Sequence, residues 1–88
     1  GYRVFTWSQK RFSKPQELIS NLKANGFKVV TIVDPGVKYE PEADYAVFDQ
    51  GMEKDFFVRD ANGKLVHGYV WPEKAVFPDF LQPEVRQW

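Results

Sequence analysis

Hydrophobic positions form one nearly unbroken run at residues 27–33, rich in β-branched side chains. A run of this kind, without polar alternation, is typical of a strand buried on both faces of a parallel sheet. The run ends at Asp34, and Pro35 and Gly36 then favour a sharp turn. Because sites in such sheets gather at the carboxyl ends of strands, Asp34 is a candidate site residue. The alternative is that its carboxylate only accepts hydrogen bonds from the turn.

Upstream of this run, apolar residues at helical spacing predict a helix over about 14–25. We expect its apolar face to lie in the core. That face comprises Leu18, Ile19 and Leu22. Ser13 followed by Gln16 matches a capping box at the start of the helix, and Gly26 is a typical residue after a helix C-terminus. A helix leading into a buried strand is half of an α/β unit.

Residues 37–80 show no helical periodicity. A connection of this length is far outside the usual range for α/β loops, so we expect it to have its own structure or function. Asn62-Gly63 separates two β-prone stretches, which predicts a hairpin. Pro83 then begins a last helix, with Glu84 in the first turn where an acidic side chain suits the helix dipole.

Composition narrows the classes of function. Twelve basic and twelve acidic side chains cancel, so nucleic acid is not an expected partner. With no cysteine and His67 as the single histidine, we expect neither a metal site nor a cofactor. No apolar run is long enough for a membrane span, and the N-terminus has no signal pattern, which is compatible with a reducing compartment such as the cytoplasm. The chain starts at Gly1 and ends at Trp88 inside the last expected helix, so we expect a segment of a longer protein.

Two further residues are candidates for a site. Trp71 follows an expected strand and precedes Pro72, which holds its backbone extended. Its indole face suits packing against a sugar ring, or alternatively it belongs to a hydrophobic cluster with Phe77 and Phe80. Asp79 either caps the turn that follows it or contributes to a site.

Several segments together resemble glycoside hydrolase family 31, the α-glucosidase family, in the family's order and spacing and over essentially the whole chain. They are residues 1–7, 28–38, 45–51, 68–72 and 77–80. The resemblance implies an α/β fold, namely a fragment of a (β/α)8 TIM barrel with one helix, one buried strand and a long loop with a β-hairpin. Residues 1–88 would then form a single segment of an incomplete barrel.

The resemblance also places each part of the chain in the barrel. It implies that residues 1–13 leave the second barrel strand and that the helix at 14–25 is the second barrel helix. Residues 27–34 would be the third strand, 35–80 the long loop after it, and 83–88 the start of the third helix. The strand edges of such a fragment would lie open, so we expect that it can self-associate.

The family's chemistry implies what this segment contributes. These enzymes cleave α-glycosidic bonds with retention, using one Asp as nucleophile and another as acid and base. The family's sequence stretches that carry these two Asp residues are not in this chain. We therefore expect the longer parent protein to be the enzyme and this piece alone to be inactive. The resemblance matches Trp71 to a Trp that walls the sugar pocket, Ile32 to an apolar pocket residue, and Asp34 to a strand-end Asp with a supporting part. Asp79 is a second expected supporting residue.

Two positions depart from the family's pattern. Ser8 stands where the family commonly has Asp, and Glu73 stands where it commonly has Gly. An acidic side chain beside Trp71 would alter the mouth of the pocket. Two other classes of protein are the alternatives: a non-catalytic carbohydrate-binding or interaction module that uses exposed aromatic rings, and a structural α+β domain whose aromatic residues form its core.

Overall fold

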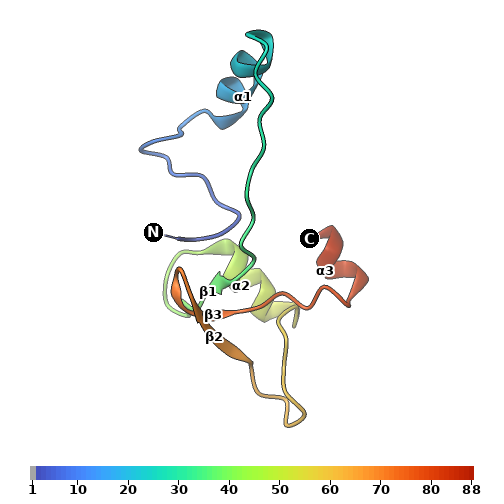
Figure 1. Cartoon of the computed structure of the whole chain (residues 1–88). Helices are drawn as coiled ribbons and strands as arrows, with labels where there is room; N and C mark the ends of the chain where they lie inside the picture. The colour runs from blue at the N-terminus through green and yellow to red at the C-terminus, as the bar shows by residue number, and fades with distance from the viewer. Residues whose placement is uncertain (1) are drawn as a thin grey trace.

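The computed structural model describes residues 2–88 and contains three helices and three strands. They are α1 (Pro15–Ala24), β1 (Val37–Lys38), α2 (Ala46–Glu53), β2 (His67–Val70), β3 (Glu73–Val76) and α3 (Pro83–Gln87). Figure 1 shows α1 at one end of the molecule, joined by a long extended segment to the part that contains the other elements.

The chain is elongated, with extents of 52 × 27 × 21 Å and a radius of gyration of 15.4 Å. A compact domain of this length has a radius of gyration of about 12 Å. The difference arises because α1 contacts no other helix or strand within residues 2–88. The expectation that its apolar face lies in the core is therefore wrong: no residue of α1 is buried, and Leu18 is 41% exposed.

The predicted limits of this helix are close to those observed, and its C-terminal end is confirmed. Gly26 adopts φ +83°, a left-handed conformation that favours glycine. Phe27 N–H donates to Leu22 O at 2.9 Å, which closes a Schellman motif. The predicted capping box is wrong, because Lys14 occupies the N-cap position and no side chain there accepts a hydrogen bond.

The apolar run at 27–33 is extended but belongs to no sheet, so the predicted buried strand is wrong for this chain. Val30 is 87% exposed and Ile32 is 97% exposed. A strand of a barrel interior needs a hydrogen-bonded neighbour on each side. No segment within residues 2–88 pairs with this run. The apolar pattern of residues 27–33 is that of a buried strand, but residues 2–88 do not contain the neighbouring strands that would bury it.

The sheet that does form is antiparallel, in the order β1-β3-β2, and not parallel as the buried run predicted. Val37 pairs with Val76, and Val70 pairs with Glu73 across the tight turn between β2 and β3. The predicted hairpin at Asn62-Gly63 is present as a turn with a single antiparallel bridge from Arg59 to Leu65.

The expectation of no helix within residues 37–80 is wrong, because α2 lies there. The pattern is weak because the helix has only eight residues and contains Gly51, a poor helix former. Gly51 is required because the Phe57 ring packs directly on it, so that a Cβ atom would lie 2.6 Å from Cε2 of that ring. Tertiary packing, and not local propensity, selects the glycine.

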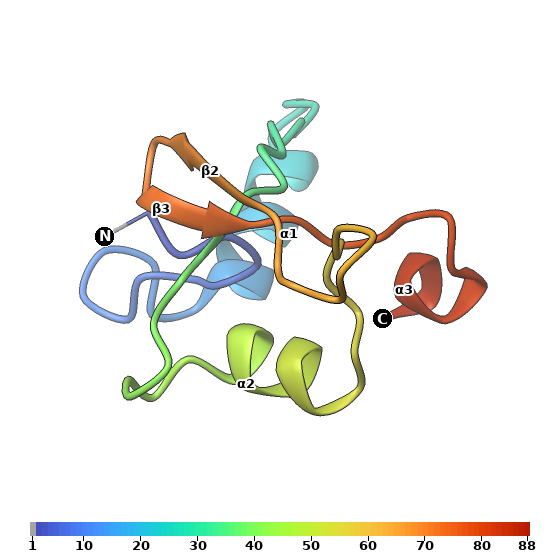
Figure 2. The same cartoon turned by 90° about the horizontal axis from the view of Figure 1, so that it is seen from below.

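The core lies between α2 and the sheet, and Figure 2 shows α2 on one side of the strands. Its buried side chains come from β1, β3, α2 and the segments next to them. They are Val37, Tyr45, Phe48, Phe57 and Val76. No helix within residues 2–88 has the length and the apolar character that crossing a membrane requires.

Candidate functional site

Three segments that are distant in sequence enclose an open hollow of about 430 Å3. The N-terminal segment 2–4, the end of the extended segment and the turn between β2 and β3 each form one wall. Its lining residues are Tyr2, Arg3, Val4, Ile32, Asp34, Gly36, Trp71 and Pro72. The structure thus brings together three of the four site residues that the sequence singled out.

Trp71 stands in the turn between β2 and β3 and is 73% exposed. Its ring stacks on that of Tyr2, with 6.2 Å between ring centroids and 24° between planes. Within residues 2–88 the indole is exposed and is not buried in a hydrophobic cluster with Phe77 and Phe80. Its free ring surface can pack against an apolar face of a ligand in the hollow.

The backbone beside Trp71 is held in an unusual conformation. Glu73 adopts φ +74°, a left-handed conformation that favours glycine. It directly follows the two-residue turn Trp71-Pro72, where a left-handed residue is usual in a bulged hairpin. The position at which the sequence departs from the family's Gly is therefore a position where Gly would relieve strain.

Ile32 and Asp34 reach the hollow from the extended segment. Both are exposed, and among the side-chain hydrogen bonds of residues 2–88 none involves the Asp34 carboxylate. The hollow therefore combines aromatic and aliphatic surface with one carboxylate. A second carboxylate, which acid–base hydrolysis would need, does not line it.

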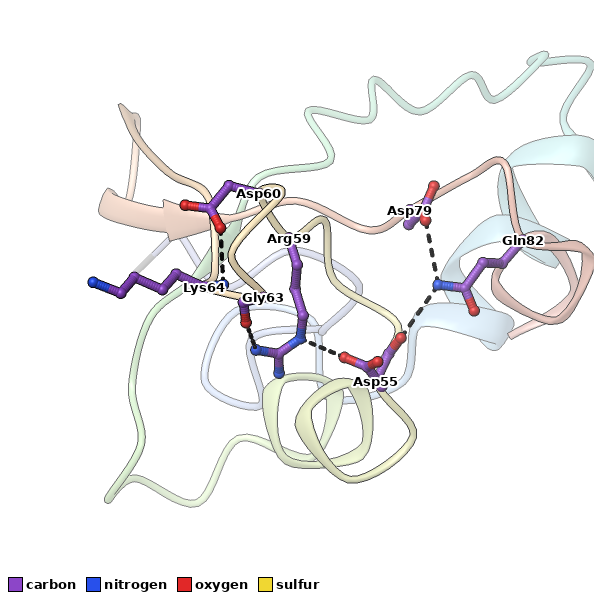
Figure 3. Close-up of polar contacts among 7 residues, drawn as sticks. All are labelled: Asp55, Arg59, Asp60, Gly63, Lys64, Asp79 and Gln82. Atoms are coloured by element: carbon purple, nitrogen blue, oxygen red, sulfur yellow. Dashed lines mark hydrogen bonds and ion pairs between the residues drawn. The ribbon is translucent and has the colours of Figure 1, made fainter.

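Asp79 lies elsewhere and does not line this hollow. Its carboxylate accepts hydrogen bonds from Leu81 N–H at 3.1 Å and from Nε2 of Gln82 at 3.3 Å. Gln82 also donates to Asp55 O at 3.2 Å, and Asp55 pairs with Arg59, so that Figure 3 shows a polar chain from the start of α3 to the turn near Gly63. The two hydrogen bonds that the Asp79 carboxylate accepts are those of a side chain that caps the turn after it.

An ion network that the sequence did not indicate lies next to the hollow. Nε of Arg3 donates to Oε2 of Glu40 at 2.6 Å, and Nζ of Lys38 lies 3.1 Å from Oε1 of the same carboxylate. The hydrogen bond from Arg3, and then that from Lys38, hold the pKa of Glu40 below its usual value. Its partner Arg3 is 37 residues away, so no local pattern could have revealed the pair.

Tyr45, at the start of α2, completes this region. Its hydroxyl donates to Val4 O at 2.8 Å, and burial raises the pKa of that hydroxyl to about 12. The guanidinium of Arg3 lies 5.6 Å from the centre of the Tyr45 ring. Within residues 2–88, no group of three His, Cys, Asp or Glu side chains is placed to hold a metal ion.

Comparison with known proteins assigns the chain to a family. The sequence profile of the Glycosyl hydrolases family 31 TIM-barrel domain matches residues 1–88. The chain belongs to glycoside hydrolase family 31. The resemblance drawn from its sequence segments is therefore confirmed, and the chain is a region of that family's TIM-barrel domain.

Its relatives in family 31 include α-glucosidases from bacteria and archaea. The chain is 47% identical over its full length to Alpha-glucosidase 2 of Bacillus thermoamyloliquefaciens, of which it covers 11%. It is 38% identical over 87 residues to Alpha-glucosidase of Saccharolobus solfataricus, covering 99% of this chain and 12% of that protein. The chain thus spans about a tenth of the length of these curated relatives.

Solved structures of the family have the same fold over this stretch. The α subunit of glucosidase II, in its alpha3-Glc2-bound form, matches with a TM-score of 0.81 and 34% identity over 98% of this chain and 9% of that one. The family 31 alpha-glucosidase from Bacteroides thetaiotaomicron matches with a TM-score of 0.77 and 39% identity over 99% of this chain and 14% of that one.

Proposed function

We propose that this chain is the pocket-wall segment of the catalytic barrel of a retaining α-glucosidase, with an α-glucoside as its substrate. The observation that supports this most is the hollow in which Trp71, Ile32 and Asp34 meet, because the resemblance to family 31 implies pocket positions for Trp71 and Ile32 and a supporting part for Asp34. The relatives named α-glucosidases support the class of substrate.

In this proposal the segment binds and orients the sugar but does not perform the bond cleavage. Retaining hydrolysis needs two carboxyl groups about 5–5.5 Å apart, and both would come from other parts of the barrel. Trp71 packs its indole against the apolar face of the sugar, and Ile32 adds aliphatic contact. Asp34 supports the end of the wall. Fixing the sugar in one orientation lowers the barrier, because a small misplacement at the reacting carbon is costly.

The exposed apolar surfaces fit the same proposal. The run at 27–33 would be the third barrel strand, paired on both sides by strands from outside this chain. The apolar face of α1 would pack against the outside of the barrel. Alone, the chain leaves both surfaces open, and the unpaired edges favour self-association.

A substitution at Trp71 in the full-length protein tests the proposal. We expect Trp71→Ala to lower kcat/KM for a nitrophenyl α-glucoside about ten- to a thousand-fold, as loss of stacking and of orientation together imply. Trp71→Phe should recover part of this loss. Tyr69→Ala is the matched control, because Tyr69 is an equally exposed aromatic residue two positions away that does not line the hollow.

The opposite result would place the ring in the core of the enzyme. In that case Trp71→Ala would unfold much of the protein while the folded remainder kept the kcat/KM of the wild type. A wild-type protein without activity on any α-glucoside would contradict the proposed class of substrate.

A further inference from the structure

The N-terminal wall of the hollow, residues 2–4, lies outside every helix and strand. Its conformation is not one that the local sequence favours, because Tyr2 adopts φ +61°. A segment of this kind keeps its position only when surrounding groups hold it. The contacts that tie it to other parts of the chain include the Arg3–Glu40 ion pair, the hydrogen bond from Tyr45 to Val4 O and the stacking of Tyr2 on Trp71.

Glu40 is well placed to hold this wall. Its side chain is 17% exposed, and its two carboxylate oxygens face two different cations, Arg3 and Lys38. Lys38 belongs to β1, and the neighbouring Tyr39 N–H donates to Lys74 O in β3 at 2.9 Å. The carboxylate therefore joins the irregular N-terminal segment to the sheet. The β2–β3 hairpin of the same sheet presents Trp71.

The geometry of the wall connects Glu40 to the ligand surface. Glu40 does not line the hollow, but Arg3, which it binds, does. The residue before Arg3 is Tyr2, whose ring stacks on Trp71. We propose that Glu40 is a positioning residue, which fixes Arg3 and thereby keeps the Tyr2 ring stacked on one face of Trp71, so that the indole is held in place at the edge of the hollow. This inference rests on the proposed function.

The expected consequence is on binding more than on folding. An isolated ion pair near a protein surface contributes little to stability. The position of a binding wall, in contrast, affects every interaction of the bound sugar, and small displacements are costly. Loss of the Glu40 charge would leave the sheet and α2 in place and release the wall.

The test compares four variants of the full-length protein. We expect Glu40→Gln to raise KM for a nitrophenyl α-glucoside about five- to fifty-fold, with kcat changed less than about threefold. Its Tm should stay within about 2 °C of the wild-type value. Glu40→Asp keeps the charge and should recover part of the KM. Tyr45→Phe removes only the second contact with the wall and should raise KM in the same direction.

Glu42→Gln is the matched control, because Glu42 is an exposed acidic residue in the same loop that does not line the hollow. It should leave KM, kcat and Tm unchanged. An unchanged KM in Glu40→Gln, or a fall in Tm with no change in KM of the folded protein, would show that Glu40 has no positioning role. If Trp71→Ala lowered kcat/KM as expected while Glu40→Gln left KM unchanged, only the inference about Glu40 would be overturned. A wild-type protein without activity on α-glucosides would overturn both that inference and the proposed function.

Discussion

The substitution Glu73→Gly isolates the backbone strain next to Trp71. Glu73 adopts φ +74° immediately after the two-residue turn between β2 and β3. A residue with a Cβ atom loses about 1–2 kcal/mol in this conformation. Glycine removes that cost. It also makes the unfolded chain more flexible, which lowers the free energy of unfolding by about 0.5–1 kcal/mol. The difference between these two costs predicts that the variant stabilises the hairpin by about 0–1.5 kcal/mol, with about 1 kcal/mol near the middle of that range.

Hydrogen exchange of the full-length protein measures this locally. A gain of about 1 kcal/mol in the free energy of opening slows amide exchange about fivefold, and the change should be confined to peptides that span β2 and β3. Glu73→Ala is the control: it removes the carboxylate but keeps a Cβ atom at the same φ, so its exchange should resemble that of the wild type.

Two results would contradict the claim that the backbone at Glu73 is strained. If Glu73→Ala slowed exchange as much as Glu73→Gly, the effect would come from removal of the charge and not from the backbone. If Glu73→Gly accelerated exchange, the left-handed conformation would not be a source of strain in the hairpin.

Three other outcomes follow from the structure. Gly51→Ala places a methyl group against the Phe57 ring and should destabilise the protein by about 1–3 kcal/mol in urea unfolding. Because the hydrogen bond from Arg3 lowers the pKa of Glu40, the ionised carboxylate stabilises the fold slightly at pH values above its usual pKa, and this contribution is lost as the pH falls through the lowered pKa; the small Tm difference between wild type and Glu40→Gln should vanish at pH values below the lowered pKa. The 88-residue polypeptide alone should release no nitrophenol from a nitrophenyl α-glucoside and should sediment as oligomers.

Local patterns predicted those parts of the chain whose conformation is set by neighbouring residues. The helix α1, its end at Gly26, the start of α3 at Pro83 and the turn at Asn62-Gly63 each depend on residues within a few positions. The resemblance to the family also predicts that Trp71 lines a sugar site; the structure places its ring on an open hollow.

Contacts distant in sequence account for what the patterns missed. The helix α2 depends on Phe57 covering Gly51, and the Arg3–Glu40 pair joins residues 37 positions apart. The run at 27–33 failed for a different reason. Its composition is that of a strand with two neighbours, and no such neighbour is present within residues 2–88.

A crystal structure of the full-length protein with a bound α-glucoside or a glucose-like inhibitor would show whether this segment forms the wall of the sugar pocket. We expect the sugar to pack against the Trp71 indole and to contact Ile32, and we expect residues 27–33 to be hydrogen-bonded on both sides within a closed barrel. A sugar bound away from Trp71, or residues 27–33 unpaired in the complete protein, would contradict this expectation.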